Sequence, residues 1–391
     1  MLVVVAPGQG SQTPGFLEPW LAIPRVHDRM RWLSAVAGLD LITHGTTSDA
    51  ETIKDTAIAQ PLLVAAGMVS LLEIFPHPSE AYAKIGAGAG HSVGEITVAG
   101  ASGIISAEQA MVFVRERGKA MAAAAAAVAT GMTAVLGGDA DEVTAHLQGL
   151  GITPANINGA GQIVAAGTIE QLDALDANPP AGTKLRRLQV AGAFHTAHMH
   201  SAVQVLSDYS RAISTHDARV PIISNADGQI VRNGREFLGR LVTQVSNPVR
   251  WDLCMQTMAD MGVTALIELP PAGTLAGLAK RALPDVEILT IKTPDDLPAA
   301  ADLIARHGKT AESADEPTWR LVVAPAKGTF RRSDSAHEFA AGSTIGTITS
   351  LRDTIDIVTP HSGVVVEWLA NDGDPVNPGQ GILRLHPIGQ G

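Results

Sequence analysis

The stretch Gly90-His-Ser92-Val-Gly94 decides the fold of this chain. It fits Gly-x-Ser-x-Gly, in which a serine lies on a tight turn between a strand and a helix, and glycines flank it because side chains would collide with neighbouring backbone. The apolar run Tyr82–Ala89 before it is predicted to be a strand, although Gly86 and Gly88 weaken it. The helix-compatible run Glu95–Ala99 follows. The pattern therefore predicts a nucleophilic serine in the turn that joins a strand to a helix. An ordinary glycine-rich turn is the alternative.

Short apolar runs alternate with longer helical patterns up to about residue 295. This alternation favours an α/β body with a largely parallel sheet. The clearest strands are predicted at Leu2–Ala6 and Val263–Leu269, and the clearest helices at Ala59–Phe75 and Leu275–Arg281.

An inserted segment interrupts this body at residues 131–191. Its predicted order is strand, helix, strand, strand, helix, strand, which matches the ferredoxin-like split unit. The body is accordingly assigned to residues 1–130 and 192–295. The six predicted elements of the insert are Met132–Gly137, Asp139–Leu150, Ala155–Asn158, Gln162–Gly167, Ile169–Leu175 and Lys184–Val190.

The composition changes after residue 295. Residues 296–319 are predicted to be a linker, because His307–Trp319 is polar and contains proline. Residues 320–391 are rich in strand formers, Gly and Pro. In this tail Val323-Ala-Pro-Ala-Lys-Gly328 resembles Val358-Thr-Pro-His-Ser-Gly363, 35 positions later. We expect a separate all-β module built from two quasi-symmetric sheets.

Composition and charge exclude several classes of protein. A formal charge of −11 argues against a general nucleic-acid binder, which would carry a basic face. The single Cys254 cannot form an intramolecular disulfide, as suits a reducing compartment. The apolar start lacks a basic region and meets Pro7-Gly8 too early for a signal peptide, and no uncharged apolar run of 18 residues predicts a membrane span. We expect a cytoplasmic protein that binds neither membrane nor nucleic acid.

Further motifs accompany the serine turn in a fixed order. Together they resemble the malonyl-CoA:acyl carrier protein transacylase family over about residues 1–290. The resemblance implies an α/β-hydrolase-like acyltransferase that uses malonyl-CoA and acyl carrier protein, as coenzyme A and phosphopantetheine thioesters, with no bound cofactor or metal. The motifs are Gly8-Gln-Gly-Ser-Gln12, Gly90-His-Ser-Val-Gly-Glu95, Arg117-Gly118 with Met121, Ala155-Asn-Ile-Asn158 with Gly161-Gln-Ile-Val164, Gly192-Ala-Phe-His195 and Asn247-Pro-Val-Arg-Trp251.

The resemblance also implies catalytic roles for matching residues. Ser92 would attack the thioester, and His195 would be its general base. The backbone carbonyl of Gln244 would orient His195 in place of a carboxylate. The developing oxyanion would meet the backbone N–H groups of Gln9 and Val93.

A second set of residues is implied in substrate binding. Arg117 would hold the free carboxylate of malonate, which suits the planar guanidinium. Phe194 stands where family members that prefer malonyl carry Phe, and would leave little room for a 2-methyl branch. Met121, His91 and Gln9 complete this set.

Each of these residues also has a simpler interpretation. His195 alone is more often a structural histidine, and a metal site with His198 and His200 lacks an acid or cysteine to complete it. Arg117 lies in Arg115–Lys119, which without the resemblance is a solvated helix face. His91 then only packs the turn, Gln9 and Gln12 close a loop, and Glu268 or Asp252 are candidates for a triad acid.

Two other functions compete with acyl transfer. A serine esterase or lipase shares the serine turn, but its triad expects an acid between serine and histidine in the sequence. An esterase also gives no role to Arg117 or to the loop Gly8-Gln-Gly-Ser-Gln12, here called the glutamine-rich loop. The other function is that of a carrier or docking component, because of the tail.

The tail resembles a biotinyl/lipoyl-type domain through several short motifs. Counting back from Pro360 puts the modified lysine of such domains at about Arg352, and no lysine occurs from Gly328 to Gly391. Phosphopantetheine on Ser350 is disfavoured, because such arms sit on helical carriers. We expect a binding or assembly module with a protein partner and no prosthetic group. The motifs are Ala324-Pro325, Gly346-Thr-Ile, Thr359-Pro-His-Ser-Gly-Val364, Gly373-Asp-Pro-Val376 and Pro378-Gly-Gln380.

An acidic carrier protein requires a local basic patch on this acidic chain. Lys184, Arg186 and Arg187 lie just upstream of the histidine motif and are the first candidates, followed by Lys280 and Arg281.

Overall fold

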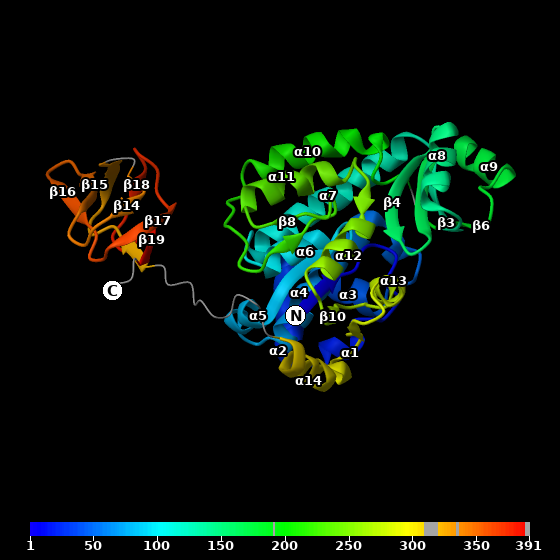
Figure 1. Cartoon of the computed structure of the whole chain (residues 1–391), viewed down its shortest axis with the longest axis horizontal. Coiled ribbons are helices and arrows are strands. Elements are labelled where there is room, and N and C mark those ends of the chain that lie inside the picture. Colours follow the sequence, from blue (N-terminus) through cyan, green and yellow to red (C-terminus); the bar gives the residue numbers. More distant parts are fainter. Residues whose placement is uncertain (191, 309–319, 334–335, 388–391) are drawn as a thin grey trace. The chain divides into compact units, whose positions relative to one another are not determined.

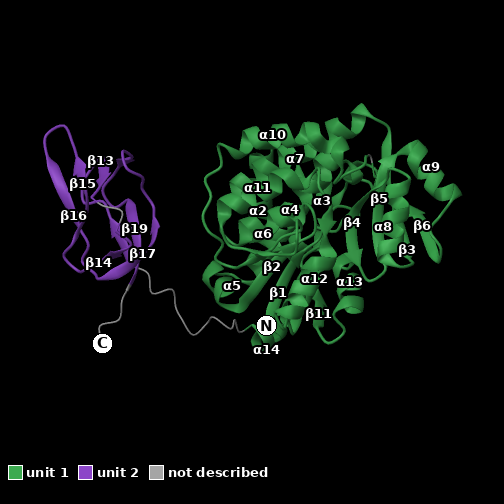
Figure 2. Ribbon diagram, turned by 45° about the horizontal axis from the view of Figure 1, so that its top comes forward, with its two compact units in different colours: residues 1–311 green, residues 312–391 purple. Residues whose placement is uncertain are grey.

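The chain folds into two compact units, residues 1–311 and 312–391, which are described separately (Figure 2). The structure is a computed structural model, and it describes residues 1–190, 192–308, 320–333 and 336–387. The last residue of the predicted insert, residues 309–319 of the predicted linker and parts of the predicted tail (334–335 and 388–391) therefore lie outside the described residues.

Among these residues, unit 1 contains a six-stranded sheet in the order β11-β10-β1-β2-β7-β8, parallel except for β8. Figure 1 shows this sheet enclosed by helices. Alternate side chains of β1 enter two different apolar clusters: Leu2 and Val4 one, Val3 and Val5 the other. Both faces of the sheet are therefore covered, as expected for parallel strands. The strands are β1 (Leu2–Ala6), β2 (Ile85–Gly90), β7 (Ile222–Ile223), β8 (Ile230–Val231), β10 (Ala265–Glu268) and β11 (Glu287–Thr290).

Helices surround this sheet, and α4 (Thr56–Ile74) runs through the core. By length and composition α4 is apolar enough to cross a membrane, but 78% of its apolar window is buried in the protein, as in a core helix. The other helical segments of the body are α1 (Glu18–Leu21), α2 (Pro24–Ala37), α3 (Leu41–Thr46), η1 (Thr52–Lys54), α5 (Pro78–Lys84), α6 (Gly94–Ala101), α7 (Ala107–Ala127), η2 (Ala197–Met199), α10 (His200–Ser210), α11 (Gly234–Gln244), α12 (Trp251–Asp260), α13 (Thr274–Ala282), η3 (Pro294–Asp296) and α14 (Leu297–His307).

A second sheet of unit 1 has the order β6-β3-β5-β4-β9. Helices α8 and α9 cover one face, where Val135 and Ile163 pack against Val143 and Leu172. On the other face Val164 joins the main core. The elements are β3 (Thr130–Gly137), α8 (Ala140–Gly149), β4 (Thr153–Gly159), β5 (Gln162–Thr168), α9 (Ile169–Ala177), β6 (Thr183–Arg187) and β9 (Val249–Arg250), the last of which comes from the body and pairs with β4 in parallel.

The predicted strand Tyr82–Ala89 is wrong in its first half. Residues up to Lys84 belong to helix α5, which begins at Pro78, a residue well suited to the first helical position. The strand begins only at Ile85. Its glycines allow close packing, since a Cβ on Gly88 would lie 2.5 Å from a methyl carbon of Val98.

The predicted linker also begins too early. Leu297–His307 forms helix α14, and its Ala300 and Leu303 are buried in the main core. The segment 296–319 contains a short helix with an apolar face, followed by a polar run. Its average composition is polar, and this average hides the helix. The predicted strand Lys184–Val190 likewise ends at Arg187.

Unit 2 consists of two antiparallel four-stranded sheets within its described residues, β12-β19-β17-β14 and β16-β15-β13-β18. The side chain of Trp368 lies between Phe330 and Phe339, with ring centroids 6.0 and 6.3 Å away. Arg352 lies in the turn between β15 and β16, where the sequence predicted it. The strands are β12 (Arg320–Val323), β13 (Gly328–Arg332), β14 (Glu338–Phe339), β15 (Thr344–Thr349), β16 (Thr354–Val358), β17 (Gly363–Trp368), β18 (Pro375–Val376) and β19 (Gly381–Pro387).

Candidate active site

Ser92 lies on a strained turn between β2 and α6. Its φ is +52°, a conformation that L-residues rarely adopt. A Cβ on Gly90 would lie 2.0 Å from the carbonyl carbon of Gly94, and a Cβ on Gly94 would lie 2.2 Å from the oxygen of Ala6. The glycines of the motif are therefore required by backbone packing.

Asn225 holds this turn in place. It lies between β7 and β8 and is fully buried. The backbone N–H of Ser92 donates to its Oδ1 at 2.7 Å, and its Nδ2 donates to the carbonyl of Gly90 at 2.6 Å. One side chain thus stabilises the strained backbone on both sides of the serine motif. Sequence reasoning missed Asn225; the only signal was a polar Ser-Asn pair directly after the apolar run that forms β7.

His195 joins the serine to the backbone of α11. Its Nε2 lies 2.7 Å from Oγ of Ser92, and its Nδ1 lies 2.9 Å from the carbonyl oxygen of Gln244. A carbonyl only accepts, so Nδ1 carries the proton and Nε2 is free to accept from the serine. Burial, with the nearby charge of Arg117, lowers the pKa of His195 to about 3. The ring is therefore neutral at physiological pH, as a general base must be.

Arg117 points from α7 into the site and is only 1% exposed. Its Nη1 donates to Oε1 of Gln60 at 2.6 Å, and its Nη2 donates to Oε1 of Gln244 at 2.7 Å and to Oγ of Ser92 at 3.2 Å. Its Nε has no hydrogen-bond partner in the described part of the chain. Burial lowers the pKa of Arg117 to about 9, so a charged guanidinium is held beside the serine at neutral pH.

The surface interpretation of this helix segment holds only for the neighbours of Arg117. Arg115 and Lys119 pair with Glu116 on the outer side. Helical spacing places Arg117 on the inner side, in line with the buried Met121.

A buried carboxylate, Glu95, lies behind the serine on α6 and is 1% exposed. Its Oε1 accepts from the backbone N–H of Asn225 at 2.6 Å, and its Oε2 accepts from Nε2 of Gln244 at 2.5 Å. Burial raises the pKa of Glu95 to about 7, and these hydrogen bonds act in the opposite direction. Sequence reasoning quoted Glu95 only as part of a motif and gave it no role.

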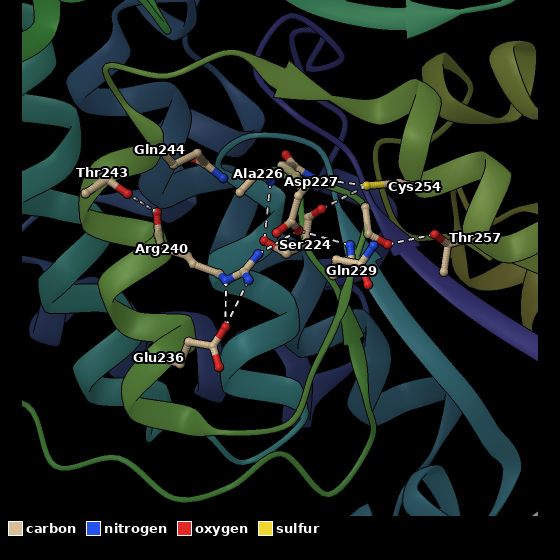
Figure 3. Close-up of polar contacts among 12 residues, drawn as sticks. Ser224, Ala226, Asp227, Gln229, Glu236, Arg240, Thr243, Gln244, Cys254 and Thr257 are labelled. Atoms are coloured by element: carbon tan, nitrogen blue, oxygen red, sulfur yellow. Dashed lines mark hydrogen bonds and ion pairs between the residues drawn. The ribbon is translucent and has the colours of Figure 1, made fainter.

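The turn that carries Asn225 is fixed to its surroundings (Figure 3). Arg240 of α11 donates to Asp227 at 2.7 Å and also pairs with Glu236. From α12, Thr257 donates to the carbonyl of Gly228 at 2.7 Å. The backbone donor of Asn225 therefore has little freedom to move.

The glutamine-rich loop lies against the start of α4. Nε2 of Gln9 donates to the carbonyl of Lys54 and to Oγ1 of Thr56, both at 3.2 Å. Gln12 donates to Ile53 at 2.9 Å, and its Oε1 also closes the loop through Gly10. These side-chain contacts leave the backbone N–H of Gln9 without an acceptor in the described residues, and the same holds for Val93.

The remaining predicted substrate residues also lie at the site. Nε2 of His91 is 2.9 Å from Oδ1 of Asn158, and its ring meets the edge of Trp251 with centroids 5.7 Å apart. Met121 accepts a hydrogen bond from Gln60 at its sulfur, 3.4 Å away. Phe194 is 6% exposed and precedes His195 in the chain.

Other candidates are not brought to the serine. Glu268 accepts from the backbone N–H groups of Gly273, Leu275 and Ala276 at the start of α13. Asp252 pairs with Arg250. His195 faces Ser92 and not a metal cluster, and the described ranges contain no group of three or more His, Cys, Asp or Glu that could hold an ion.

The three residues of the proposed basic patch lie on both faces of β6, because successive side chains of a strand point to opposite faces. Lys184 and Arg186 are exposed and pair in register with Leu136 and Ala134 of β3. Arg187 points to the opposite face and pairs with acidic residues of α9, so it was wrongly included in the patch.

Comparison with known proteins places this geometry in a family context. Residues 3–302 match the acyl transferase domain family. The chain is 46% identical over 308 residues to the malonyl CoA-acyl carrier protein transacylase of Mycobacterium tuberculosis H37Rv, covering 78% of this chain and 100% of that protein. It is 33% identical over 309 residues to the enzyme of that name from Escherichia coli O157:H7, covering 76% and 98%.

Solved structures of transacylases are also similar to this chain. The crystal structure of MCAT from Mycobacterium tuberculosis matches with a TM-score of 0.74 at 46% identity, covering 77% of this chain and 99% of that one. The malonyl-transacylase PlMCAT, solved in complex with the type II PKS acyl-carrier protein AntF, matches with a TM-score of 0.70 at 29% identity and the same coverage. Unit 2 lies outside the family match.

Proposed function

The chain belongs to the malonyl CoA-acyl carrier protein transacylase family, and we propose that Ser92 carries the malonyl group between the two thiols. The enzyme is an acyltransferase that takes malonyl-CoA and acyl carrier protein as substrates. The observation that carries the assignment of the site is the cluster of Ser92, His195 and Arg117, in which the histidine nitrogen lies 2.7 Å and the guanidinium 3.2 Å from the serine oxygen.

The reaction proceeds in two half-reactions. Oγ of Ser92 attacks the thioester carbonyl of malonyl-CoA while Nε2 of His195 takes its proton. The oxyanion is stabilised by the backbone N–H groups of Gln9 and Val93, whose lack of internal acceptors supports this role. The C–S bond breaks and the thiol of coenzyme A leaves with the proton from His195. The phosphopantetheine thiol of the carrier protein then attacks the serine ester by the same steps.

Arg117 binds the free carboxylate of the malonyl group. It is a buried cation, and within the described part of the chain Glu95 is the charge that opposes the lowering of its pKa by burial; Gln244 lies between the two side chains. A carboxylate that reaches the guanidinium compensates the loss of hydration that burial imposes. Phe194 limits the space for a branch at C2, while Met121 and His91 line the acyl site.

We further propose finer assignments for the fold, for unit 2 and for the cellular location. The mainly parallel sheet with its serine turn is α/β-hydrolase-like, and the strand order β6-β3-β5-β4 corresponds to a ferredoxin-like insert. Unit 2 has paired four-stranded sheets like a biotinyl/lipoyl domain, with Arg352 at the attachment position. It acts as a binding or assembly module, and we place the enzyme in the cytoplasm.

Incubation with malonyl-CoA distinguishes this function from that of a serine esterase. We expect intact-mass measurement to show a lasting malonyl adduct, which acyl carrier protein then removes as malonyl-carrier. Rapid release of free malonate without carrier, and no adduct, would assign the site to hydrolysis.

A further inference from the structure

Glu95 uses both carboxylate oxygens as acceptors, one for each of two different site residues. Oε1 faces the backbone N–H of Asn225 and Oε2 faces the side-chain amide of Gln244. A carboxylate can accept at both oxygens, whereas an amide of the same size has only one oxygen. A Gln at position 95 would have nearly the same shape as Glu but could not accept both of these hydrogen bonds.

The amide of Gln244 connects Glu95 to Arg117. Its Nε2 donates to Glu95 and to the carbonyl of Ser92, and its Oε1 accepts from Arg117 at 2.7 Å. A carboxylate only accepts and a guanidinium only donates, so this amide orientation is the only one that satisfies both ends. Glu95 thereby determines that an oxygen faces Arg117.

We propose that Glu95 is a positioning residue for substrate specificity: it fixes the amide of Gln244, which in turn holds Arg117 in the orientation that receives a carboxylate. This inference rests on the proposed role of Arg117. Gln60 accepts from Nη1 and Gln244 from Nη2, so the two glutamines hold both terminal nitrogens and leave the N–H of Nη2 that faces Ser92 for the substrate.

The substitution Glu95→Gln tests this arrangement with almost no change of shape. The peptide N–H of Asn225 cannot turn, so the new amide keeps its oxygen there and presents its NH₂ group to Gln244. Two donors then face each other. Gln244 either turns its own NH₂ group toward Arg117 or moves away, and in both cases Arg117 loses an acceptor.

The measurement is kcat/KM for self-acylation by malonyl-CoA and by acetyl-CoA. In Glu95→Gln we expect malonyl loading to fall about ten- to hundredfold, the range for a lost hydrogen bond to a charged group. Acetyl-CoA brings no carboxylate to the guanidinium, so acetyl loading should fall less than malonyl loading, by only the part of the loss that reaches Ser92 and His195 through Gln244. The ratio of the two rates is the readout, because general loosening of the fold lowers both.

Glu73→Gln is the matched control. Glu73 is another buried carboxylate, paired with Arg25 and Arg29 away from the site. Its substitution should lower the melting temperature without changing the malonyl-to-acetyl ratio. A parallel Arg117→Ala enzyme tests the premise, since it must show a large fall in that ratio.

Two results would overturn the proposal. Glu95→Gln could leave the malonyl-to-acetyl ratio at the wild-type value, with or without an equal fall of both rates, while Arg117→Ala changes it. In that case the link from Glu95 to Arg117 fails and the role of Arg117 stands. An unchanged ratio in Arg117→Ala removes the role of Arg117 and this proposal together.

Discussion

Ser92 and Ser350 both lie in tight turns, one in each unit of the chain, and their hydroxyl groups are used differently. Oγ of Ser350 accepts from the backbone N–H groups of Arg352 and Asp353, so it closes its own turn. Oγ of Ser92 closes nothing and instead faces His195 and Arg117, while Asn225 holds its backbone. The difference shows that a reactive serine needs its backbone fixed by other groups so that its hydroxyl is free.

The two turns also differ in what surrounds them. The turn of Ser92 is held by buried side chains from distant segments, among them Asn225 and Gln244, and Glu95 behind it is almost inaccessible to solvent. The turn of Ser350 joins β15 to β16, with Leu351 fully exposed. The serine of unit 1 is therefore surrounded by buried polar partners, whereas the turn in unit 2 is open to solvent.

The largest difference in transfer rate is expected between the variants Ser92→Ala and Ser350→Ala. Ser92→Ala removes the nucleophile and should abolish transfer, and His195→Ala should lower its rate by about 10²–10⁴. Ser350→Ala should transfer malonyl to carrier protein at the wild-type rate. Steady-state assays of the three variants measure this, and near-normal transfer by Ser92→Ala or His195→Ala would end the mechanism proposed here.

Arg117→Ala should lower the rate of malonyl loading far more than the rate of acetyl loading. Loss of one partner of a buried charge pair costs about 2–5 kcal/mol, which lowers malonyl loading about thirty- to several-thousandfold. Acetyl loading should change little or improve. Rates measured with both thioesters decide the matter, and an equal loss with both would mean that Arg117 supports structure only.

Charge reversal at Lys184 and Arg186 should have a smaller effect, confined to the second half-reaction. These exposed residues lie on the edge strand β6, three strand spacings or roughly 14 Å from β4, which contacts His91 through Asn158. We expect transfer to the acidic carrier to fall about tenfold at low ionic strength, with self-acylation unchanged.

The double substitution of Arg31 in α2 and Arg211 at the end of α10 by Glu is the control for this reversal, because it makes the same change of charge on two exposed residues of other elements. If transfer to the carrier stays at its normal rate in the variant reversed at Lys184 and Arg186, the docking patch lies elsewhere, with Lys280 and Arg281 next to be tested.

Removal of unit 2 should have the smallest effect. The Mycobacterium tuberculosis relative is matched over its whole length by 78% of this chain, so a transacylase of that length exists without such a unit. A chain ending at Gly308 should transfer malonyl in solution at the rate of the full chain. A large loss of transfer with the same melting temperature would show that unit 2 takes part in the reaction.

The sequence predicted that Ser92, His195 and Arg117 belong to one site because each sits in a short local motif, and the structure brings them together. Strand β1 and the strands of the small sheet were also predictable, because their periodicity is strong. It placed the linker too early, because the apolar face of α14 spans only three turns. Strand β2 was extended into α5, since both are short and rich in alanine.

The polar network behind the serine could not be predicted in the same way. Glu95 and Asn225 are 130 residues apart, and their contact depends on how the sheet brings β7 next to β2. Arg187 was placed in the basic patch because the alternation of β6 was not combined with the acidic residues of α9. Local patterns therefore point to candidate reactive groups, and only the fold shows which side chains form hydrogen bonds with them.

The most direct test of the central claim is to locate the acyl group on the full chain. The protein is incubated with malonyl-CoA, digested and mapped by peptide mass spectrometry, with Ser92→Ala and Ser350→Ala treated in parallel. We predict malonyl on the peptide that contains Ser92 in the wild type and in Ser350→Ala, and none in Ser92→Ala. Malonyl on any other residue, or an adduct that persists in Ser92→Ala, would contradict the account.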